Sequence, residues 1–373
     1  MPTVPRGGKV LVSGANGYIA MWTVKILLQQ GYRVRGTVRS AEKGKFMSDY
    51  FAKLGYGEAF EFVIVQDIIK DGAFDEVVKD VDAIEHMASP VHFNPGDPQG
   101  EWYLCFYFSY LISLGIETLK PAIQGTVSML KSAMKNGTKV KRIVITSSTA
   151  AIASLNLDLF TEPRIFSERD WNEASPKEVE ELGSKASAVT VYRASKSLAE
   201  RAAWDFYNEH KAQVQWDLTV INPPGVFGPP IHDVTSPKSL NLSLQVWYDM
   251  VASGSPKTKE ALSQSPAWVD VRDTALAHVL ALNNEAAGAE RILTVSDFEG
   301  VCYWQKWIDT VNNLKPNPHP SHKFIFGYPE IAQEKVVLAT LDKSKEERIF
   351  GIKFKTMEET AKDTLEDFAR RGW

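Results

Sequence analysis

The sequence has little cysteine, no excess of one charge and no long hydrophobic run. Its two cysteines, Cys105 and Cys302, are too few for a disulfide framework or a cysteine-based zinc site. The 42 Lys and Arg are balanced by 46 Asp and Glu, so the chain lacks the concentrated basic surface that binds nucleic acid. We therefore expect no nucleic-acid partner and a reducing compartment, with the cytoplasm as the location.

The apolar runs are too short for a targeting or membrane segment. The run before Gly14 is shorter than the roughly 7–15 residues of a signal-peptide core. The uncharged stretch at 102–116 is shorter than the about 20 residues that span a bilayer. We expect neither a signal peptide nor a membrane-spanning helix.

What the sequence does contain is a regular alternation of strand-like and helix-like segments. Short β-branched runs predict strands, and the amphipathic stretches between them predict helices. The expected strands are Lys9–Ser13, Arg33–Val38, Glu61–Gln66, Ala83–Ala88, Arg142–Thr146 and Asp217–Asn222, and the expected helices are Tyr18–Gln30, Phe46–Leu54, Phe74–Val78, Leu119–Asn136, Tyr192–Asn208 and, at the tail, Met357–Arg371. This order predicts an α/β protein with a doubly wound parallel sheet, a Rossmann fold.

The pattern changes after Pro223. Pro- and Ser-rich segments at 228–238 and 253–266 replace the regular alternation. We therefore predict a dinucleotide-binding domain over residues 1–225, to which residues 267–290 return. Residues 226–266 and 291–373 are expected to form a smaller substrate-binding lobe.

A glycine loop follows the first strand and opens the first helix. Gly14, Gly17 and Ala20 form a G-x-x-G-x-x-A pattern. Glycine lets the backbone turn sharply and approach a pyrophosphate, which then lies on the amides of the helix N-terminus. Because the loop stands between a strand and a helix, we interpret it as a cofactor loop rather than a simple turn.

Two basic residues follow the second strand. NAD-binding folds usually place an acidic residue there, which binds the ribose 2′-hydroxyl. This chain instead has Arg39 and, one turn further on, Lys43. A guanidinium and an ammonium suit a 2′-phosphate, so the pair favours NADP (NADPH) as the cofactor. The alternative is a solvated pair on a surface helix.

Tyr192 and Lys196 lie four residues apart and therefore on one face of the expected helix. A nearby ammonium stabilises a phenolate, which suits Tyr192 to proton transfer. This spacing alone is common. However, the strand at 142–146 is followed by hydroxyl residues, including Ser148, at the edge where doubly wound folds bind ligands. We predict that Ser148, Tyr192 and Lys196 form a catalytic set.

Nearly the whole chain resembles the extended short-chain dehydrogenases/reductases, in the dihydroflavonol-4-reductase-like branch that includes fungal aldehyde, ketone and methylglyoxal reductases. The matching segments, in order, are VSGANGYIA, GTVRSAEK, VQDI, HMASPV, RIVITSSTAAI, YRASK, INPPGVFGP and WVDVRDTALAH. The resemblance implies hydride transfer from NADPH to an aldehyde or ketone, which includes secondary-metabolite intermediates. In that reaction Tyr192 would donate the proton and Ser148 would polarise the carbonyl.

The resemblance also implies which residues bind the cofactor. They are Gly14, Asn16, Gly17, Tyr18, Ile19, Arg39, Lys43, Asp67, Ile68, Ala88, Tyr192, Lys196, Pro223 and Val226. Of these, Asp67 and Ile68 would flank the adenine, and Pro223 and Val226 would border the nicotinamide. The substrate pocket would come largely from the segments after Pro223.

The histidines and the remaining aromatic residues have simpler interpretations. His86 and His92 have no carboxylate partner in register, so we predict no metal site. His278 is expected to be either packed or solvated, and the aromatic residues of 301–309 are expected to pack in the core. Cys302 has no neighbouring base that would activate it.

The segment Gly100–Ile116 departs from the family pattern. Without these 17 residues the chain would read DPQETLKPAIQGT, as the family does, and the segment is too apolar for an ordinary surface loop. Our hypothesis is that it is translated from a retained intron, because its codons can include a splice donor and acceptor. A mature transcript that always keeps the segment would contradict this. The alternatives are a membrane-contacting loop and a partner-binding patch.

The expected function is therefore NADP-dependent oxidoreduction at the carbonyl or CH–OH group of a small molecule, by a monomer or homodimer. One alternative is an NAD(P)-dependent epimerase or dehydratase, which shares the fold and the Tyr–Lys pair. Another is a non-catalytic NADP-binding sensor, a class that typically lacks this pair.

Overall fold

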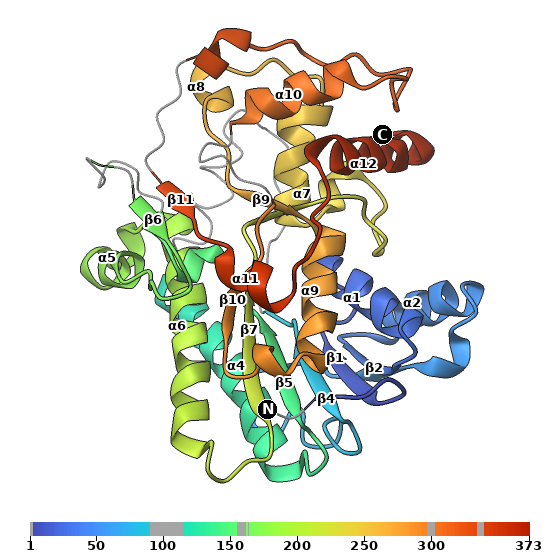
Figure 1. The fold of residues 1–373 in the computed structure, drawn as a ribbon, viewed down its shortest axis with the longest axis vertical. Helices are drawn as coiled ribbons and strands as arrows, with labels where there is room; N and C mark the ends of the chain where they lie inside the picture. The colour runs from blue at the N-terminus through green and yellow to red at the C-terminus, as the bar shows by residue number, and fades with distance from the viewer. Residues whose placement is uncertain (1–2, 90–114, 155–161, 163, 297–302, 334–338) are drawn as a thin grey trace.

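A sheet of seven parallel strands forms the centre of the protein (Figure 1). The computed structural model describes residues 3–89, 115–154, 162, 164–296, 303–333 and 339–373. The strand order β3-β2-β1-β4-β5-β7-β10 shows that the chain builds one half of the sheet outward from β1 and the other half outward from β4. The predicted doubly wound α/β fold is confirmed. The strands are β1 (Lys9–Ser13), β2 (Arg33–Val38), β3 (Phe60–Ile64), β4 (Ala83–His86), β5 (Arg142–Thr146), β7 (Asp217–Asn222) and β10 (Arg291–Leu293).

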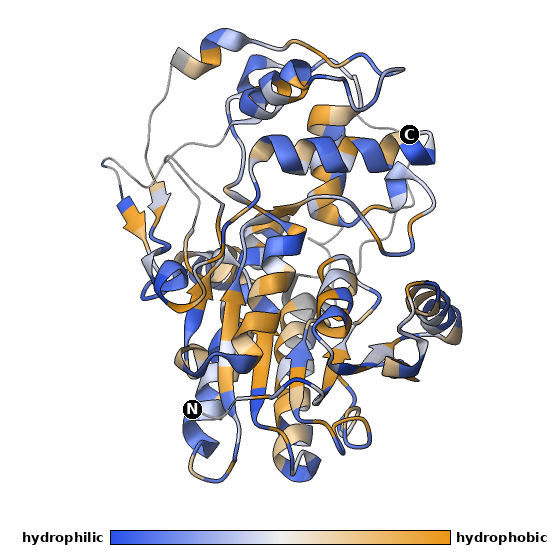
Figure 2. Cartoon of the chain, turned by 45° about the vertical axis from the view of Figure 1, so that its right-hand side comes forward, coloured by the Kyte–Doolittle hydropathy of each residue, from blue (hydrophilic) through white to orange (hydrophobic). Residues whose placement is uncertain are grey.

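Helices cover both faces of this sheet. On one face lie α1 (Tyr18–Gln29), α2 (Ala41–Lys53) and α9 (Val271–Asn283), and on the other lie α4 (Gly115–Asn136) and α6 (Ala188–His210) (Figure 1). The central strands β1, β4, β5 and β7 are therefore buried on both sides. This explains why they are apolar along most of their length (Figure 2).

Successive residues of one strand serve two separate cores. Val10 and Val12 of β1 pack with the core beneath α1, whereas Leu11 packs with the core beneath α4. This alternation is the period-2 geometry of a strand. It fixes the register of β1, because a slip of one residue would exchange the two sets.

Most predicted elements agree with the structure, and the differences have local causes. Helix α2 begins at Ala41, before the predicted start at Phe46, because the Ser40 side chain caps it by accepting a hydrogen bond from the Lys43 amide. The predicted helix at 74–78 is a series of turns. Strand β10 belongs to the sheet, so the part of the chain that returns to the sheet extends beyond the predicted boundary at residue 290.

A second lobe lies above the carboxyl ends of the strands (Figure 1). Its core is aromatic and includes the buried residues Trp247, Trp268, Trp304 and Trp307. Trp304 and Trp307 belong to the segment 301–309, whose aromatic residues were expected in the core. The lobe contains β8 (Gly225–Phe227) paired with β9 (Trp268–Asp270), and the helices α7 (Leu242–Trp247), α8 (Lys259–Leu262), α10 (Trp304–Asn313) and α12 (Met357–Arg371).

A further two-stranded sheet lies at the rim of the molecule. It pairs β6 (Arg164–Phe166) with β11 (Ala339–Leu341), near α5 (Ala174–Leu182) and α11 (Ser344–Ile349) (Figure 1). Within the described residues, the helices are either too short or too polar to cross a membrane. His92, Cys105, Cys302 and residues 100–114 lie outside the described part of the chain.

Candidate active site

The glycine loop between β1 and α1 lies at the carboxyl edge of the sheet, against the end of β4. Gly14 has a φ of +61°, and a Cβ at this position would lie 2.9 Å from the Cα of Ala88, so other residues do not fit there. The Ser13 hydroxyl accepts hydrogen bonds of 3.0 Å from the amides of Met87 and Ala88. These two bonds hold the ends of β1 and β4 together and place Ala88 behind the loop.

Helix α1 begins with amides that no side chain caps. Gly17 is its N-cap residue, and the first turn contains no acidic side chain. Unpaired N–H groups and the helix dipole together favour an anion at this position. The loop therefore fits the pyrophosphate of a dinucleotide, with Asn16 and Ile19 half-buried beside it.

Tyr18 turns its side chain away from this anion site. Its hydroxyl donates a hydrogen bond of 2.7 Å to the carbonyl oxygen of Gly228 in the second lobe, and burial raises the pKa of Tyr18 well above its usual value. Only the backbone amide of Tyr18 thus remains for a cofactor. The side chain instead links α1 to the lobe.

Arg39 and Lys43 lie beside the glycine loop, at the end of β2 and in the first turn of α2. The end of β2 is held against the loop, because the Thr37 Oγ1 accepts a hydrogen bond of 3.3 Å from the Gly14 amide. Arg39 is exposed, whereas the Nζ of Lys43 lies 3.0 Å from Oδ2 of Asp233. A 2′-phosphate fits these two cations, but it would share Lys43 with a carboxylate.

Ser148 lies just beyond β5 and caps the short 3-10 helix η2 (Thr149–Ala151). Its Oγ accepts a hydrogen bond of 3.1 Å from the Ala150 amide. Because the backbone N–H supplies that proton, the hydroxyl keeps its own proton for a second partner. Ser148 can therefore donate to a carbonyl oxygen placed above it.

Tyr192 and Lys196 lie on α6, whose first turn is fixed by the Ser187 side chain. The Nζ of Lys196 lies 6.0 Å from the centre of the Tyr192 ring. Helix α6 packs against η2, the short helix that Ser148 caps. Burial and, to a lesser extent, the charge of Lys196 lower the pKa of His86, the last residue of β4, to about 4.

The other predicted cofactor residues have different environments. Asp67 is exposed and its Oδ1 accepts a hydrogen bond from the Ile69 amide, whereas Ile68 is buried. Pro223 is buried and its carbonyl oxygen accepts a hydrogen bond from the Thr149 amide, beside Ser148. Val226 lies in β8 and packs in the aromatic core of the lobe.

Two buried histidines, His86 and His278, have hydrogen-bond partners in the core. Nδ1 of His86 lies 2.9 Å from the Ser13 hydroxyl. Nδ1 of His278 lies 2.7 Å from Oε2 of Glu85, and its Nε2 lies 3.1 Å from the Thr146 hydroxyl. Burial lowers the pKa of His278 to about 3, so it is neutral at physiological pH.

The interpretation of the sequence missed a polar network beneath Ser148. Glu200, one turn after Lys196 on α6, binds Ser147, Asn222 and Arg291. A signal for Glu200 was present, because Tyr192, Lys196 and Glu200 follow one another at four-residue intervals and share a helix face. Asn222 and Arg291 gave no such signal, because their proximity arises only when the sheet forms.

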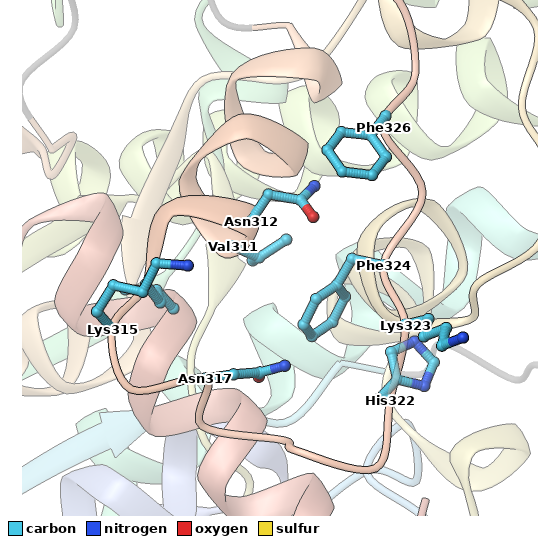
Figure 3. A pocket seen from close by; sticks show the side chains of 9 residues that line it. Val311, Asn312, Lys315, Asn317, His322, Lys323, Phe324 and Phe326 are labelled. Atoms are coloured by element: carbon cyan, nitrogen blue, oxygen red, sulfur yellow. The ribbon is translucent and has the colours of Figure 1, made fainter.

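A separate pocket opens on the second lobe, near the C-terminal end of α10 (Figure 3). Its volume is about 290 Å³, and the residues that line it include Asn312, Lys315, Phe324 and Phe326. This pocket contains none of the predicted site residues.

The candidate active site is the carboxyl edge of the sheet, because the glycine loop, the Ser148 turn and α6 meet there.

A glycine loop at the switch of strand order, before an uncapped helix, defines a dinucleotide-binding protein of the Rossmann class. Residues 10–100 and 112–295 match the model of the NAD dependent epimerase/dehydratase family. The chain belongs to this family, which is that of the extended short-chain dehydrogenases/reductases, as predicted. The unmatched residues 101–111 lie within the segment Gly100–Ile116.

Fungal reductases are among the similar proteins. The chain is 36% identical over 296 residues to the ketoreductase azaE of Aspergillus niger, covering 77% of this chain and 78% of that protein. It is 32% identical over 363 residues to the NADPH-dependent methylglyoxal reductase GRE2 of Saccharomyces cerevisiae, and the match covers 95% of this chain and 96% of that protein. The crystal structure of Gre2 from Candida albicans in complex with NADPH has a TM-score of 0.78 to this structure, with 33% identity over 99% of this chain and 100% of that one.

Proposed function

We propose that the protein is an NADPH-dependent carbonyl reductase that converts an aldehyde or ketone to an alcohol. The observation that carries this proposal is the meeting of three elements at the carboxyl edge of the sheet. These are the Ser148 turn, the face of α6 with Tyr192 and Lys196, and the glycine loop. The names of the similar fungal proteins, a ketoreductase and an NADPH-dependent methylglyoxal reductase, support the same class of activity.

Each member of the catalytic set has a distinct task. The Ser148 hydroxyl, whose oxygen already accepts the Ala150 amide, donates to the substrate carbonyl oxygen and stabilises the charge that develops there. Tyr192 transfers its phenolic proton to that oxygen. The ammonium of Lys196 stabilises the phenolate that remains. When bound, the reduced nicotinamide supplies the hydride for the carbonyl carbon.

The cofactor is NADPH, bound along the edge from β3 to β7. Gly14, Gly17 and the amides of Tyr18 and Ile19 would hold the pyrophosphate, with Asn16 beside it. Arg39 and Lys43 would bind the 2′-phosphate. Asp67 and Ile68 would flank the adenine, Ala88 would lie behind the cofactor, and Pro223 and Val226 would border the nicotinamide, with Lys196 on its ribose.

We further propose that residues 226–266 and 294–373 supply most of the substrate pocket, and that the substrate is a small carbonyl compound. The protein would act as a monomer or homodimer. Its low cysteine content supports a reducing compartment such as the cytoplasm.

The test is NADPH consumption over a panel of aldehydes and ketones by the protein and by Tyr192→Phe. We expect turnover by the former and a kcat lowered by roughly 10²–10⁴ in the variant, with NADPH binding retained. A version without residues 100–116, assayed beside them, shows whether that segment obstructs the site.

Other outcomes identify the alternatives. Conversion of nucleotide sugars without net NADPH consumption would establish an epimerase. NADPH binding without turnover of any substrate would favour a sensor. Failure to bind NADPH would contradict the role of Gly14, Gly17 and Arg39.

A further inference from the structure

Glu200 is a buried carboxylate directly beneath the Ser148 turn. It is 2% exposed and lies on α6, one turn after Lys196. Its Oε2 accepts hydrogen bonds of 2.5 Å from the Ser147 hydroxyl and 2.8 Å from Nδ2 of Asn222. Its Oε1 lies 2.5 Å from Nε of Arg291. Oε1 also accepts a hydrogen bond of 3.4 Å from Nε1 of Trp204, one turn further along α6. Both carboxylate oxygens are therefore occupied, by donors from β7, β10, α6 and the residue that follows β5.

Two of these donors are joined to Ser148. Ser147 precedes Ser148 in the chain, and its amide donates a hydrogen bond of 2.8 Å to the carbonyl oxygen of Ile221. Asn222 donates from the same Nδ2 to the carbonyl oxygen of Ser148, at 3.2 Å. The carboxylate of Glu200 thus fixes the residue before Ser148 and the amide that holds the Ser148 backbone.

Arg291 completes the network from the edge of the sheet. Its Nη1 donates to the carbonyl oxygens of Glu168 and Asp170, at 2.7 and 2.8 Å. Its guanidinium also lies 3.7 Å from the centre of the Trp171 ring. A buried ion pair often adds little net stability compared with apolar packing. A contribution to stability alone therefore does not explain why Glu200 and Arg291 are paired here.

We propose that Glu200 is a positioning residue for carbonyl reduction: through Ser147 and Asn222 it holds the Ser148 hydroxyl at the place where it donates to the substrate oxygen. This inference rests on the proposed function, because Glu200 acts through Ser148 and touches neither substrate nor cofactor. One face of α6 then carries the proton donor, the ammonium and, a turn below, the group that sets the position of the third catalytic residue.

The variant Glu200→Gln tests the proposal with little change in shape. Glutamine has one acceptor oxygen and one NH₂ group. Its NH₂ group would have to face either the guanidinium of Arg291 or the donors of Ser147 and Asn222, so one of these hydrogen bonds is lost. We expect a loss of about tenfold to hundredfold in kcat, because a small displacement of a catalytic group has effects of this size. The KM for the carbonyl substrate and the dissociation constant for NADPH should change by no more than about twofold, because the lost interaction belongs to the transition state.

Glu168→Gln is the matched control. Glu168 is also buried, at 6% exposure, and its Oε1 accepts a hydrogen bond from the Leu293 amide, which a glutamine oxygen can still do. The bond between its backbone carbonyl and Arg291 is unaffected by the substitution. We expect its kcat to equal that of the unmodified protein. An equal loss of kcat in both variants would show general damage and overturn the proposal.

The deciding measurement repeats Glu200→Gln in a Ser148→Ala background. If Glu200 acts through Ser148, the second substitution causes no further loss of kcat. A further loss equal to that in the unmodified background would overturn the proposal. Ser147→Ala, which leaves no unpaired charge, serves if Glu200→Gln fails to fold; it should lower kcat in the unmodified background only.

The same experiment separates this inference from the proposed function. If Ser148→Ala leaves kcat unchanged, the proposed catalytic set is wrong and the role of Glu200 falls with it. If Ser148→Ala lowers kcat and Glu200→Gln does not, the catalytic set stands and only the positioning role is wrong.

Discussion

The carboxyl edge of the sheet and the core of the second lobe are built from different interactions. At the edge, Ser147, Glu200, Asn222 and Arg291 form hydrogen bonds and an ion pair that fix atoms at specific distances. In the lobe, the indole rings pack against each other, and the ring centres of Trp268 and Trp307 are 4.8 Å apart. Directional hydrogen bonds hold individual atoms at fixed positions, as a reaction requires. An apolar core instead holds the lobe together while its surface residues can be exchanged. We infer that the chemistry and the choice of substrate are encoded in separate parts of the molecule.

The two regions are nevertheless joined by polar contacts around residues 228–234. Besides the bond from Tyr18 to Gly228, Nε1 of Trp22 donates to the carbonyl oxygen of Pro229 at 2.9 Å. Within the lobe, Nη2 of Arg371 in α12 donates to the carbonyl oxygen of Pro230 at 3.0 Å, so the segment that contacts α1 is also bound to α12. The following predictions therefore test each region and then their junction.

The largest effect is expected from Trp307→Ala, which breaks the aromatic core. Trp307 is fully buried and touches Phe227, Trp247 and Trp268. We expect the free energy of unfolding to fall by about 3–5 kcal/mol, measured by urea denaturation. The control Phe326→Ala, on a side chain that is 76% exposed, should change it by less than about 0.5 kcal/mol. Similar losses in the free energy of unfolding for the two variants would contradict the role of the aromatic core in stabilising the lobe.

The next effect concerns His232 at the junction. Burial, then the charge of Arg371 and to a lesser extent Lys43, lower its pKa from 6.5 to about 4, whereas Asp233 acts in the opposite direction. The unfolded chain therefore binds a proton between these values that the folded protein does not. This contribution to stability is complete above pH 6.5 and is lost as the pH falls towards 4.

His232→Gln isolates this contribution. Between pH 7 and pH 5, the free energy of unfolding of the unmodified protein should fall by about 2 kcal/mol more than that of the variant. Urea denaturation at the two pH values measures the difference. Parallel pH dependences in both proteins would show that His232 accepts a proton in the folded state without cost.

A smaller effect is expected at the cofactor edge from Arg39→Ala. Loss of the guanidinium should weaken NADPH binding by about tenfold, roughly 1.4 kcal/mol, and leave NADH binding within about twofold, because only NADPH carries the 2′-phosphate. Calorimetric titration with both cofactors measures this. Lys53→Ala, on the last turn of α2, removes the same charge away from the loop and should affect neither. Equal weakening of both cofactors by Arg39→Ala would contradict a phosphate contact.

The smallest effect is expected from Asp233→Asn, which removes the partner of Lys43. The carboxylate competes with a 2′-phosphate for the ammonium, so its removal should strengthen NADPH binding by a few-fold, about 1 kcal/mol or less. Asp49→Asn is the matched control, because Asp49 pairs with Lys45 on the same helix at 2.6 Å. Weaker NADPH binding in Asp233→Asn would show that the ion pair supports the site instead.

The parts of the fold that were predicted correctly are those that a short stretch of sequence determines by itself. The strands β1, β5 and β7 have the predicted bounds because buried parallel strands are short β-branched runs. The start of α2 was wrong because one cap, Ser40, outweighed the apolar pattern that begins at Phe46. Local patterns identify elements and place them in order.

Contacts between distant residues were the part that the sequence could not supply. The glycine loop was recognised from its spacing, but the turn of the Tyr18 side chain towards Gly228 depends on a segment 210 positions later. The pairs Lys43–Asp233 and Glu200–Arg291 likewise join segments that meet only after folding. Any one such carboxylate looks like a solvated surface charge until its partner is known.

The bond from Tyr18 to Gly228 has a consequence for engineering. Tyr18 follows Gly17, so in the proposed binding mode the same helical turn would face the dinucleotide on one side, and its side chain contacts the lobe on the other. A library that alters substrate scope by randomising residues 228–230 would therefore also select, unintentionally, on cofactor affinity. Such a library is better directed at other positions of the lobe, with Tyr18 and Gly228 left unchanged.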